Sequence, residues 1–394
     1  MTVLEGYSIS VLRYLAVLCA AAVTMALLPL AGVAVAQQPD LSDACPVEPG
    51  QAPFTDRDDI PDAHVRNVDC AEDFGIVTGF VDNSYGPRLP VRRDQMASFI
   101  ARGLDAAGVN LPSGDENRFT DVTTGPHRVN VNRLAEADIV RGGAQNLPAT
   151  QYGAGLQTRR DQMASFLMRA AGYALEDNPD AFEDDFSDDA DQVFTDVPPG
   201  NTHFGNVNAA SEFGLAQGFV DGLYRPGQST RRDQMASFVV RLLNFLAVPT
   251  EVEITDQTPE TATVGETITV TAMVFDQYGN PAAETTTVTF SVDPPTAAET
   301  QTVTTDANSE AEFSFTPVVP ETVTVTASIE GPGGNFTAQG DSDSVEIAVV
   351  LADDDGDDLN GLLNGLLPVD ILAADVDQTV ATALASGGAP GRRR

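Results

Sequence analysis

One block of eight residues, Arg-Arg-Asp-Gln-Met-Ala-Ser-Phe, occurs three times in the first half of the chain. A Phe-Thr-Asp triplet precedes each copy, a His lies between the triplet and the block, and another Arg follows ten positions after the block begins. Because these features recur in the same order, this half is one folding unit repeated with small loop changes. The blocks begin at Arg92, Arg159 and Arg231, the triplets at Phe54, Phe119 and Phe194, the histidines are His64, His127 and His203, and the later arginines are Arg102, Arg169 and Arg241.

Apolar spacing predicts two helices in each unit. In the first unit, Val68, Ala71 and Phe74 lie three residues apart before Gly75, which suits a helix C-cap. Residues 96–104 then carry apolar side chains at the spacing of a buried helical stripe. A pair of short amphipathic helices cannot bury its apolar faces alone, so we expect the three copies to pack together as an all-α, three-repeat domain with pseudo-three-fold helical symmetry.

This order of motifs resembles the surface-layer homology (SLH) repeat family over about residues 54–246. The resemblance implies a helical domain whose grooves bind an anionic cell-wall polysaccharide, often pyruvylated, without a covalent bond. It also implies that a helix-start motif, Thr-Arg-Ala-Glu, lines those grooves. With Met-Ala-x-Phe setting the register, the motif Arg falls on Arg93, Arg160 and Arg232, its Glu position on Gln95, Gln162 and Gln234, and its Thr position on Arg92, Arg159 and Arg231.

A second register remains open, because a shift of one residue makes Thr158 and Thr230 the motif Thr and the first Arg of each pair the ligand. Both arginines of each pair are therefore candidate ligands, and we favour the second. A guanidinium at a helix N-terminus stands where the backbone amides already favour an anion, and it can bind a carboxylate through two parallel hydrogen bonds. In the alternative, the arginines pair with Asp94, Asp161 and Asp233 and only hold the units together.

Two further features concern the same units. The histidines are expected to pack and hydrogen-bond within their own repeats, with a three-His metal site as the alternative. The second unit has Gly142–Gln145, Gly-Gly-Ala-Gln, where the others have Gly-Phe-Val-Asp, so its groove is expected to bind weakly or to take another sugar.

The N-terminal residues indicate export. An uncharged stretch rich in Leu, Ala and Val follows Arg13 and ends in Ala-Val-Ala, which predicts a signal peptide cleaved after Ala36. An uncleaved anchor is the alternative, because the apolar run is long enough to span a bilayer. Cleavage leaves two cysteines, Cys45 and Cys70, and an even pair in an exported chain suggests one disulfide.

Charge limits the partners of this protein. Acidic residues outnumber basic ones 58 to 21, and the net charge is −37. A polyphosphate partner needs a basic face, so the balance argues against nucleic acid. An acid excess with every base an Arg is typical of proteins that stay soluble in concentrated salt, and we predict a salt-rich habitat.

The hydrophobic period changes to two in the second half. Apolar and polar residues alternate in residues 268–274, 288–292, 311–315, 323–329 and 345–349. This pattern predicts an all-β sandwich of about seven strands. Asp276–Pro281 and Thr305–Asn308 are similar to sequences in bacterial immunoglobulin-like domains of the invasin and intimin type, which implies a spacer or an adhesive stalk.

These features together predict an exported, multidomain protein of the cell wall and cell surface, anchored through its repeats and displaying the sandwich. The alternatives are an adhesin whose sandwich binds another cell or matrix, and an enzyme or the anchoring subunit of one. No nucleophile or metal motif is present, so no enzyme, cofactor or metal is expected, and calcium is only a weak candidate in the acidic runs 176–191 and 353–358. Self-association in a surface layer is a further expectation, and no membrane span is expected after cleavage.

The predicted domains are a signal peptide (1–36), an N-terminal segment (37–53), repeats at 54–108, 119–173 and 194–246, an acidic insertion (174–193), the sandwich (250–351) and an acidic tail with an amphipathic helix (352–394).

Overall fold

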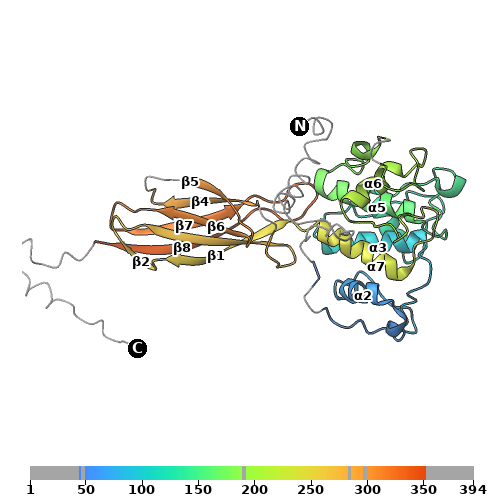
Figure 1. The fold of residues 1–394 in the computed structure, drawn as a ribbon, viewed down its shortest axis with the longest axis horizontal. Coiled ribbons are helices and arrows are strands. Elements are labelled where there is room, and N and C mark those ends of the chain that lie inside the picture. The colour runs from blue at the N-terminus through green and yellow to red at the C-terminus, as the bar shows by residue number, and fades with distance from the viewer. Residues whose placement is uncertain (1–43, 46–48, 189–191, 283–284, 296–299, 352–394) are drawn as a thin grey trace, which may run out of the picture.

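The computed structural model describes residues 44–45, 49–188, 192–282, 285–295 and 300–351. A helical part and a β-sandwich lie end to end along the long axis of the molecule (Figure 1). The predicted signal peptide and acidic tail lie outside the described residues.

The helical part is built on three helices that each begin at the second Arg of a block. Among the described residues there are six α-helices and three short 3-10 helices in this part. In chain order they are η1 (Arg57–Asp59), α2 (Asp62–Asp73), α3 (Arg93–Ala106), α4 (Arg128–Glu136), η2 (Ala144–Asn146), α5 (Arg160–Glu176), η3 (Asp184–Phe186), α6 (Phe204–Glu212) and α7 (Arg232–Phe245). We call α3, α5 and α7 the Arg-led helices.

Extended backbone before each Arg-led helix joins the three helices at the centre of the helical part. Val91 donates its backbone N–H to Thr230, Thr230 donates to Thr158, and Thr158 donates back to Val91, each at 2.9 Å. The three bonds form a closed ring between segments far apart in the sequence. Buried residues such as Met96, Met163 and other members of the apolar stripes pack around it in one continuous core.

The predicted all-α, three-repeat domain with pseudo-three-fold symmetry is wrong. Among the described residues, six helices are joined by long irregular segments, 3-10 helices and isolated β-bridges. The units are also unequal, because α5 has 17 residues whereas α3 and α7 have 14. The physical reason is that residues 177–188, which follow α5, pack into the core through Phe182 and Phe186, so the surroundings of α5 differ from those of its counterparts.

A disulfide joins Cys45 to Cys70 of α2, with the two Cα atoms 5.6 Å apart. Buried Asp69, the neighbour of Cys70, accepts hydrogen bonds from the backbone of Ala52 and from the guanidinium of Arg57. The segment before α2 is therefore held to that helix by a covalent bond and by hydrogen bonds.

The C-terminal part is all-β. Two sheets pack face to face, with strand orders β1-β3-β6 and β2-β8-β7-β4-β5. The described residues contain eight strands rather than about seven, because short β2 pairs in parallel with β8. Fully buried residues alternate with less buried ones in β3, β4, β6 and β7, and Phe290 and Phe313 stack between the sheets with ring centroids 5.1 Å apart. The strands are β1 (Pro249–Thr258), β2 (Thr261–Thr263), β3 (Ile268–Asp276), β4 (Thr287–Asp293), β5 (Thr300–Thr304), β6 (Glu310–Phe315), β7 (Thr322–Ile329) and β8 (Asp341–Val350).

Two loops of the sandwich contact the helical part. Tyr278 donates a hydrogen bond to the carbonyl of Leu243 in α7, at 3.1 Å. On the other loop, the backbone N–H of Asn335 donates to Ala174 in α5, and Asn110 donates its N–H back to the Asn335 carbonyl. Contacts from two loops to different helices fix the orientation of the sandwich better than the single chain crossing after α7 would.

Candidate functional site

The first Arg of each block is the N-cap of an Arg-led helix and pairs with an Asp of the first turn. Nε and Nη2 of Arg92 each donate to one carboxylate oxygen of Asp94, both at 3.0 Å. These contacts correspond to the alternative in which the first Arg has a structural role, and binding by it stays a prediction. The same two-bond pair joins Arg159 to Asp161 and Arg231 to Asp233.

The Gln at the motif's Glu position helps to cap the N-terminus of each Arg-led helix. The side-chain carbonyl of Gln95 accepts the backbone N–H of Arg92 at 3.1 Å. This contact is half of a capping box, which satisfies a backbone donor that the helix leaves unpaired. Gln162 and Gln234 make the same contact to Arg159 and Arg231, each at 3.2 Å.

The second Arg of each block is buried and crosses to the segment that precedes another Arg-led helix. Arg232 donates from Nε to the carbonyl of Tyr85 at 2.6 Å and from Nη2 to that of Thr78 at 3.1 Å. Its guanidinium lies over the rings of Phe80 and Tyr85, each 4.7 Å from the ring centroid. Arg93 makes the same two bonds to Tyr152 and Arg141, and Arg160 makes them to Tyr224 and Gln217.

Carbonyl and aromatic partners decide the electrostatics of these three arginines. Their hydrogen-bond partners among the described residues are backbone carbonyls, whose partial charges do not neutralise a cation. Burial lowers the pKa of all three guanidiniums, yet arginine stays charged in proteins. Each of the three groups uses the same two nitrogen atoms, Nε and Nη2, for these bonds. The exposed fractions are 3% for Arg93, 4% for Arg160 and 4% for Arg232.

Each His contacts a Ser on a neighbouring Arg-led helix. Nδ1 of His127 lies 2.8 Å from Oγ of Ser98 in α3, so the predicted hydrogen bond within the histidine's own repeat is wrong. Burial lowers the pKa of the three histidines, which favours neutral rings at physiological pH. The other pairs are His203 with Ser165 and His64 with Ser237, both at 2.8 Å.

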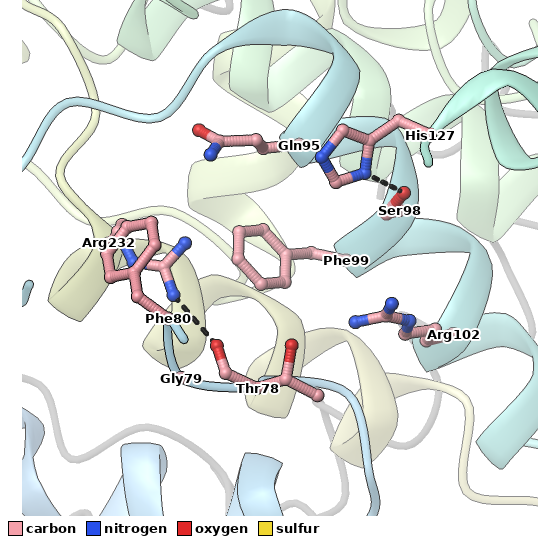
Figure 2. A pocket seen from close by; sticks show the side chains of 9 residues that line it. All are labelled: Thr78, Gly79, Phe80, Gln95, Ser98, Phe99, Arg102, His127 and Arg232. Atoms are coloured by element: carbon pink, nitrogen blue, oxygen red, sulfur yellow. Dashed lines mark hydrogen bonds between the residues drawn. The ribbon is translucent and has the colours of Figure 1, made fainter. Parts of the chain in front are cut away.

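A cavity of about 180 Å³ opens where α3, the loop before it, His127 and Arg232 meet. Figure 2 shows Arg232 and Arg102 on opposite sides of the Phe99 ring, with Thr78 between them on the loop. Arg102 donates from Nη1 to the carbonyl of Ile76 at 3.1 Å, so most of its donors are left for a ligand. We call this cavity the first site. Its lining residues are Thr78, Gly79, Phe80, Gln95, Ser98, Phe99, Arg102, His127 and Arg232.

The first site suits an anion with an apolar face. Two guanidiniums can share one carboxylate, and such charge-assisted bonds are stronger than neutral ones. The rings of Phe80 and Phe99 supply flat apolar walls, while Gln95, Ser98 and neutral His127 supply hydrogen bonds to hydroxyl groups. Apolar walls with a few convergent polar groups are the usual composition of a small-ligand site.

Sequence reasoning named only part of this cavity. Two of the ligands predicted from the motif, Arg232 and Gln95, line the first site. Arg92, which was also predicted, is not among the lining residues of this cavity. Arg102, Phe80 and His127 were not predicted as ligands. The signal was present, because an Arg recurs ten positions after each block begins and a His precedes each block.

The described ranges contain neither a metal-binding cluster nor a membrane-spanning helix. No group of three or more His, Cys, Asp or Glu in this part of the chain could hold a metal ion. None of the described helices combines the length and apolar character needed to span a bilayer.

Parts of the chain match the models of two known families. Residues 53–97 and 193–236 match the S-layer homology domain, and residues 251–340 match the bacterial Ig-like domain of group 1. S-layer homology domains place the protein at the cell surface in association with the cell wall, which confirms the predicted location.

Individual relatives cover only parts of the molecule. A "Cell surface protein" of Thermoanaerobacter kivui is 33% identical over 128 residues, which make up 32% of this chain and 15% of that relative. Among solved structures, the D0-D1 domain of intimin is 23% identical, with a TM-score of 0.18 over 26% of this chain and 48% of that one. A CARDB domain from Pyrococcus furiosus is 15% identical, with a TM-score of 0.20 over 27% of this chain and 96% of that one. Scores this low carry no argument about fold.

Proposed function

We propose that this protein is held non-covalently on an anionic cell-wall polysaccharide by its helical part and displays its Ig-like sandwich outward from the wall. The first site carries the proposal. Its guanidiniums, Arg102 and Arg232, would bind a carboxylate of the polymer, and its Phe rings would pack against a sugar face. In a chain with net charge −37, a cavity lined by two arginines and no acidic residue is a local reversal of charge.

The restraint on Arg232 supports this role. Its guanidinium is held by two backbone carbonyls and lies between aromatic rings, so binding costs little further side-chain order. The first site by itself would contribute modest affinity, and a polymer with repeated carboxylates can engage several copies of the protein on one wall.

The sandwich supports a role in display. It is attached through the loops of Tyr278 and Asn335, so its far end points away from the helical part (Figure 1). The matches to S-layer homology and Ig-like domains support a structural, non-enzymatic role, which we propose for this protein. Binding of the sandwich to another cell would be a separate activity, and no feature of its strands favours one.

Co-sedimentation of the purified protein with cell-wall sacculi tests the proposal, before and after the secondary polymers are extracted. We expect binding that is lost on extraction. The R102Q variant should bind about tenfold more weakly, because it loses charge-assisted hydrogen bonds to the carboxylate. R88Q is the matched control, since it removes the same charge from an exposed position.

Circular dichroism would show that each variant is folded. Equal sedimentation of the wild-type protein with intact and extracted sacculi, or equal binding by R102Q and R88Q, would overturn the proposal. We test Arg102 rather than the buried arginines of the motif, because loss of those groups also disturbs the fold.

A further inference from the structure

The Arg-led helix α5 has the parts of a second site, made of Arg169, Arg93 and His203. Arg169 occupies the place of Arg102, ten positions after its block begins, and His203 contacts Ser165 as His127 contacts Ser98. Arg93 donates to carbonyls of the segment before α5, as Arg232 donates to carbonyls of the segment before α3. The two sites therefore present the same cations in the same order.

The ion pairs of the second site are different. Nε of Arg169 lies 3.3 Å from Oδ1 of Asp180, and its Nη2 lies 3.2 Å from Oε2 of Glu183. Arg102, by contrast, donates to a backbone carbonyl, and acidic side chains are absent from the lining of its cavity. Only 12% of the Arg169 side chain is exposed. Carboxylates of the protein thus occupy the position where the first site would receive one from a ligand.

A second cation strengthens this internal arrangement. The backbone carbonyl of Arg141 accepts the hydrogen bond from Arg93, as the carbonyl of Thr78 accepts one from Arg232 in the first site. The side chain of Arg141 pairs with the same acid as Arg169, because its Nη2 lies 2.6 Å from Oδ2 of Asp180. Asp180 is therefore shared between two guanidiniums. Two residues after Arg141 lies Gly143, where the first site has Phe80. The second site therefore lacks one of the two ring walls, while Phe166 corresponds to Phe99.

The segment that carries the two acids is packed firmly in place. The Phe182 ring is fully buried against Phe213, with centroids 5.4 Å apart. A Cβ on Gly205 of α6 would lie 2.5 Å from the carbonyl oxygen of Glu183, and one on Gly172 of α5 would lie 2.5 Å from that of Asn178. These glycines permit the close approach of the segment to both helices.

We propose that Asp180 and Glu183 keep the second site from binding the polymer, because their carboxylates occupy this site and close it to carboxylate-bearing polysaccharide. This inference rests on the proposed function of the first site. The carboxylates of the acidic insertion then take the place of the ligand's carboxylate, and the site on α5 does not bind the wall polymer.

The test compares variants of the full protein in sedimentation with sacculi. In the wild-type background, R102Q should weaken binding about tenfold, whereas R169Q should change it less than about twofold. D180A/E183A should bind several-fold more tightly, and R169Q added to it should remove that gain. D59A/E116A is the control, because it removes the same charge from exposed positions. D180N/E183Q replaces the alanine pair if that pair does not fold.

Two results would overturn the inference while leaving the proposed function intact. The first is that R169Q, made in the wild-type background, weakens binding to sacculi as much as R102Q does. The second is that folded D180A/E183A or D180N/E183Q binds sacculi no more tightly than the wild type. If no form binds sacculi, the proposed function fails instead. Closure of the second site is then measured by phenylglyoxal modification and peptide mapping. Arg169 should react several-fold faster in D180A/E183A than in the wild type, and equal rates would overturn the inference.

Discussion

The helical part and the sandwich bury different chemistry. The centre of the helical part contains Arg93, Arg160 and Arg232, together with Asp161 and Asp233. The space between the two sheets is filled by apolar side chains such as Phe290 and Phe313, and the sandwich's buried polar groups, Asp276, Thr305 and Ser309, lie at strand ends and turns.

This difference teaches how each half is specified. An apolar core is stabilised by area removed from water and tolerates rearrangement if volume is kept. A buried guanidinium has few acceptable partners, so it selects one arrangement of the segments around it. The helical part therefore combines the groups that hold its fold with those that face a ligand, whereas the sandwich needs no charged group in its core.

The largest effect is expected from loss of an apolar side chain in the sandwich. F290A should lower the free energy of unfolding of the sandwich by about 4 kcal/mol, because it removes a fully buried ring and leaves a cavity. Hydrogen exchange read by mass spectrometry should show faster exchange in residues 249–350 and little change in α3. Equal loss of protection in both halves would mean that they unfold as one unit.

Loss of a buried guanidinium comes next. R232A should destabilise the helical part by about 3 kcal/mol, because it leaves the carbonyls of Tyr85 and Thr78 unpaired and removes contacts with two or more rings. Urea unfolding measures the change. R88A, at an exposed position, should change stability by less than about 0.5 kcal/mol. An equally small effect of R232A would contradict the structural role of the buried arginine.

Removal of the disulfide should cost somewhat less. C45S/C70S should lower the stability of the helical part by about 2 kcal/mol, because the unfolded chain gains freedom and the native bonds to Asp69 partly remain. Thermal unfolding with and without a reductant compares the two forms. The stability of the sandwich should not change. A fall in the stability of both halves would contradict their independent unfolding.

The smallest effect concerns pH. Burial lowers the pKa of the three histidines in the folded chain, while the unfolded chain keeps values near 6.5. Below that value the unfolded state binds more protons, so the stability of the helical part should fall between about pH 7 and about pH 5.5. The sandwich has no His and should change little. The H64Q/H127Q/H203Q variant should flatten the dependence, and an unchanged slope would assign it to other groups.

Periodicity predicted most elements but not their relations. Spacing of three and four residues indicated α3, and strict alternation indicated β3 and β7, because both patterns record which side of an element meets the core. The motif also located the helix starts. It did not indicate that Arg232 would contact Tyr85, 147 positions away, or that His127 would contact a Ser of another unit.

The sequence by itself determined that the chain has a helical half with S-layer homology motifs and a β half with Ig-like patterning, since local spacing encodes burial. Only the tertiary structure decided which arginine faces an open cavity and which faces a carboxylate of the protein. Arg102 and Arg169 occupy the same place in their blocks. They differ because residues 177–188 fold back onto α5, and a contact made by chain return depends on packing that no local pattern records.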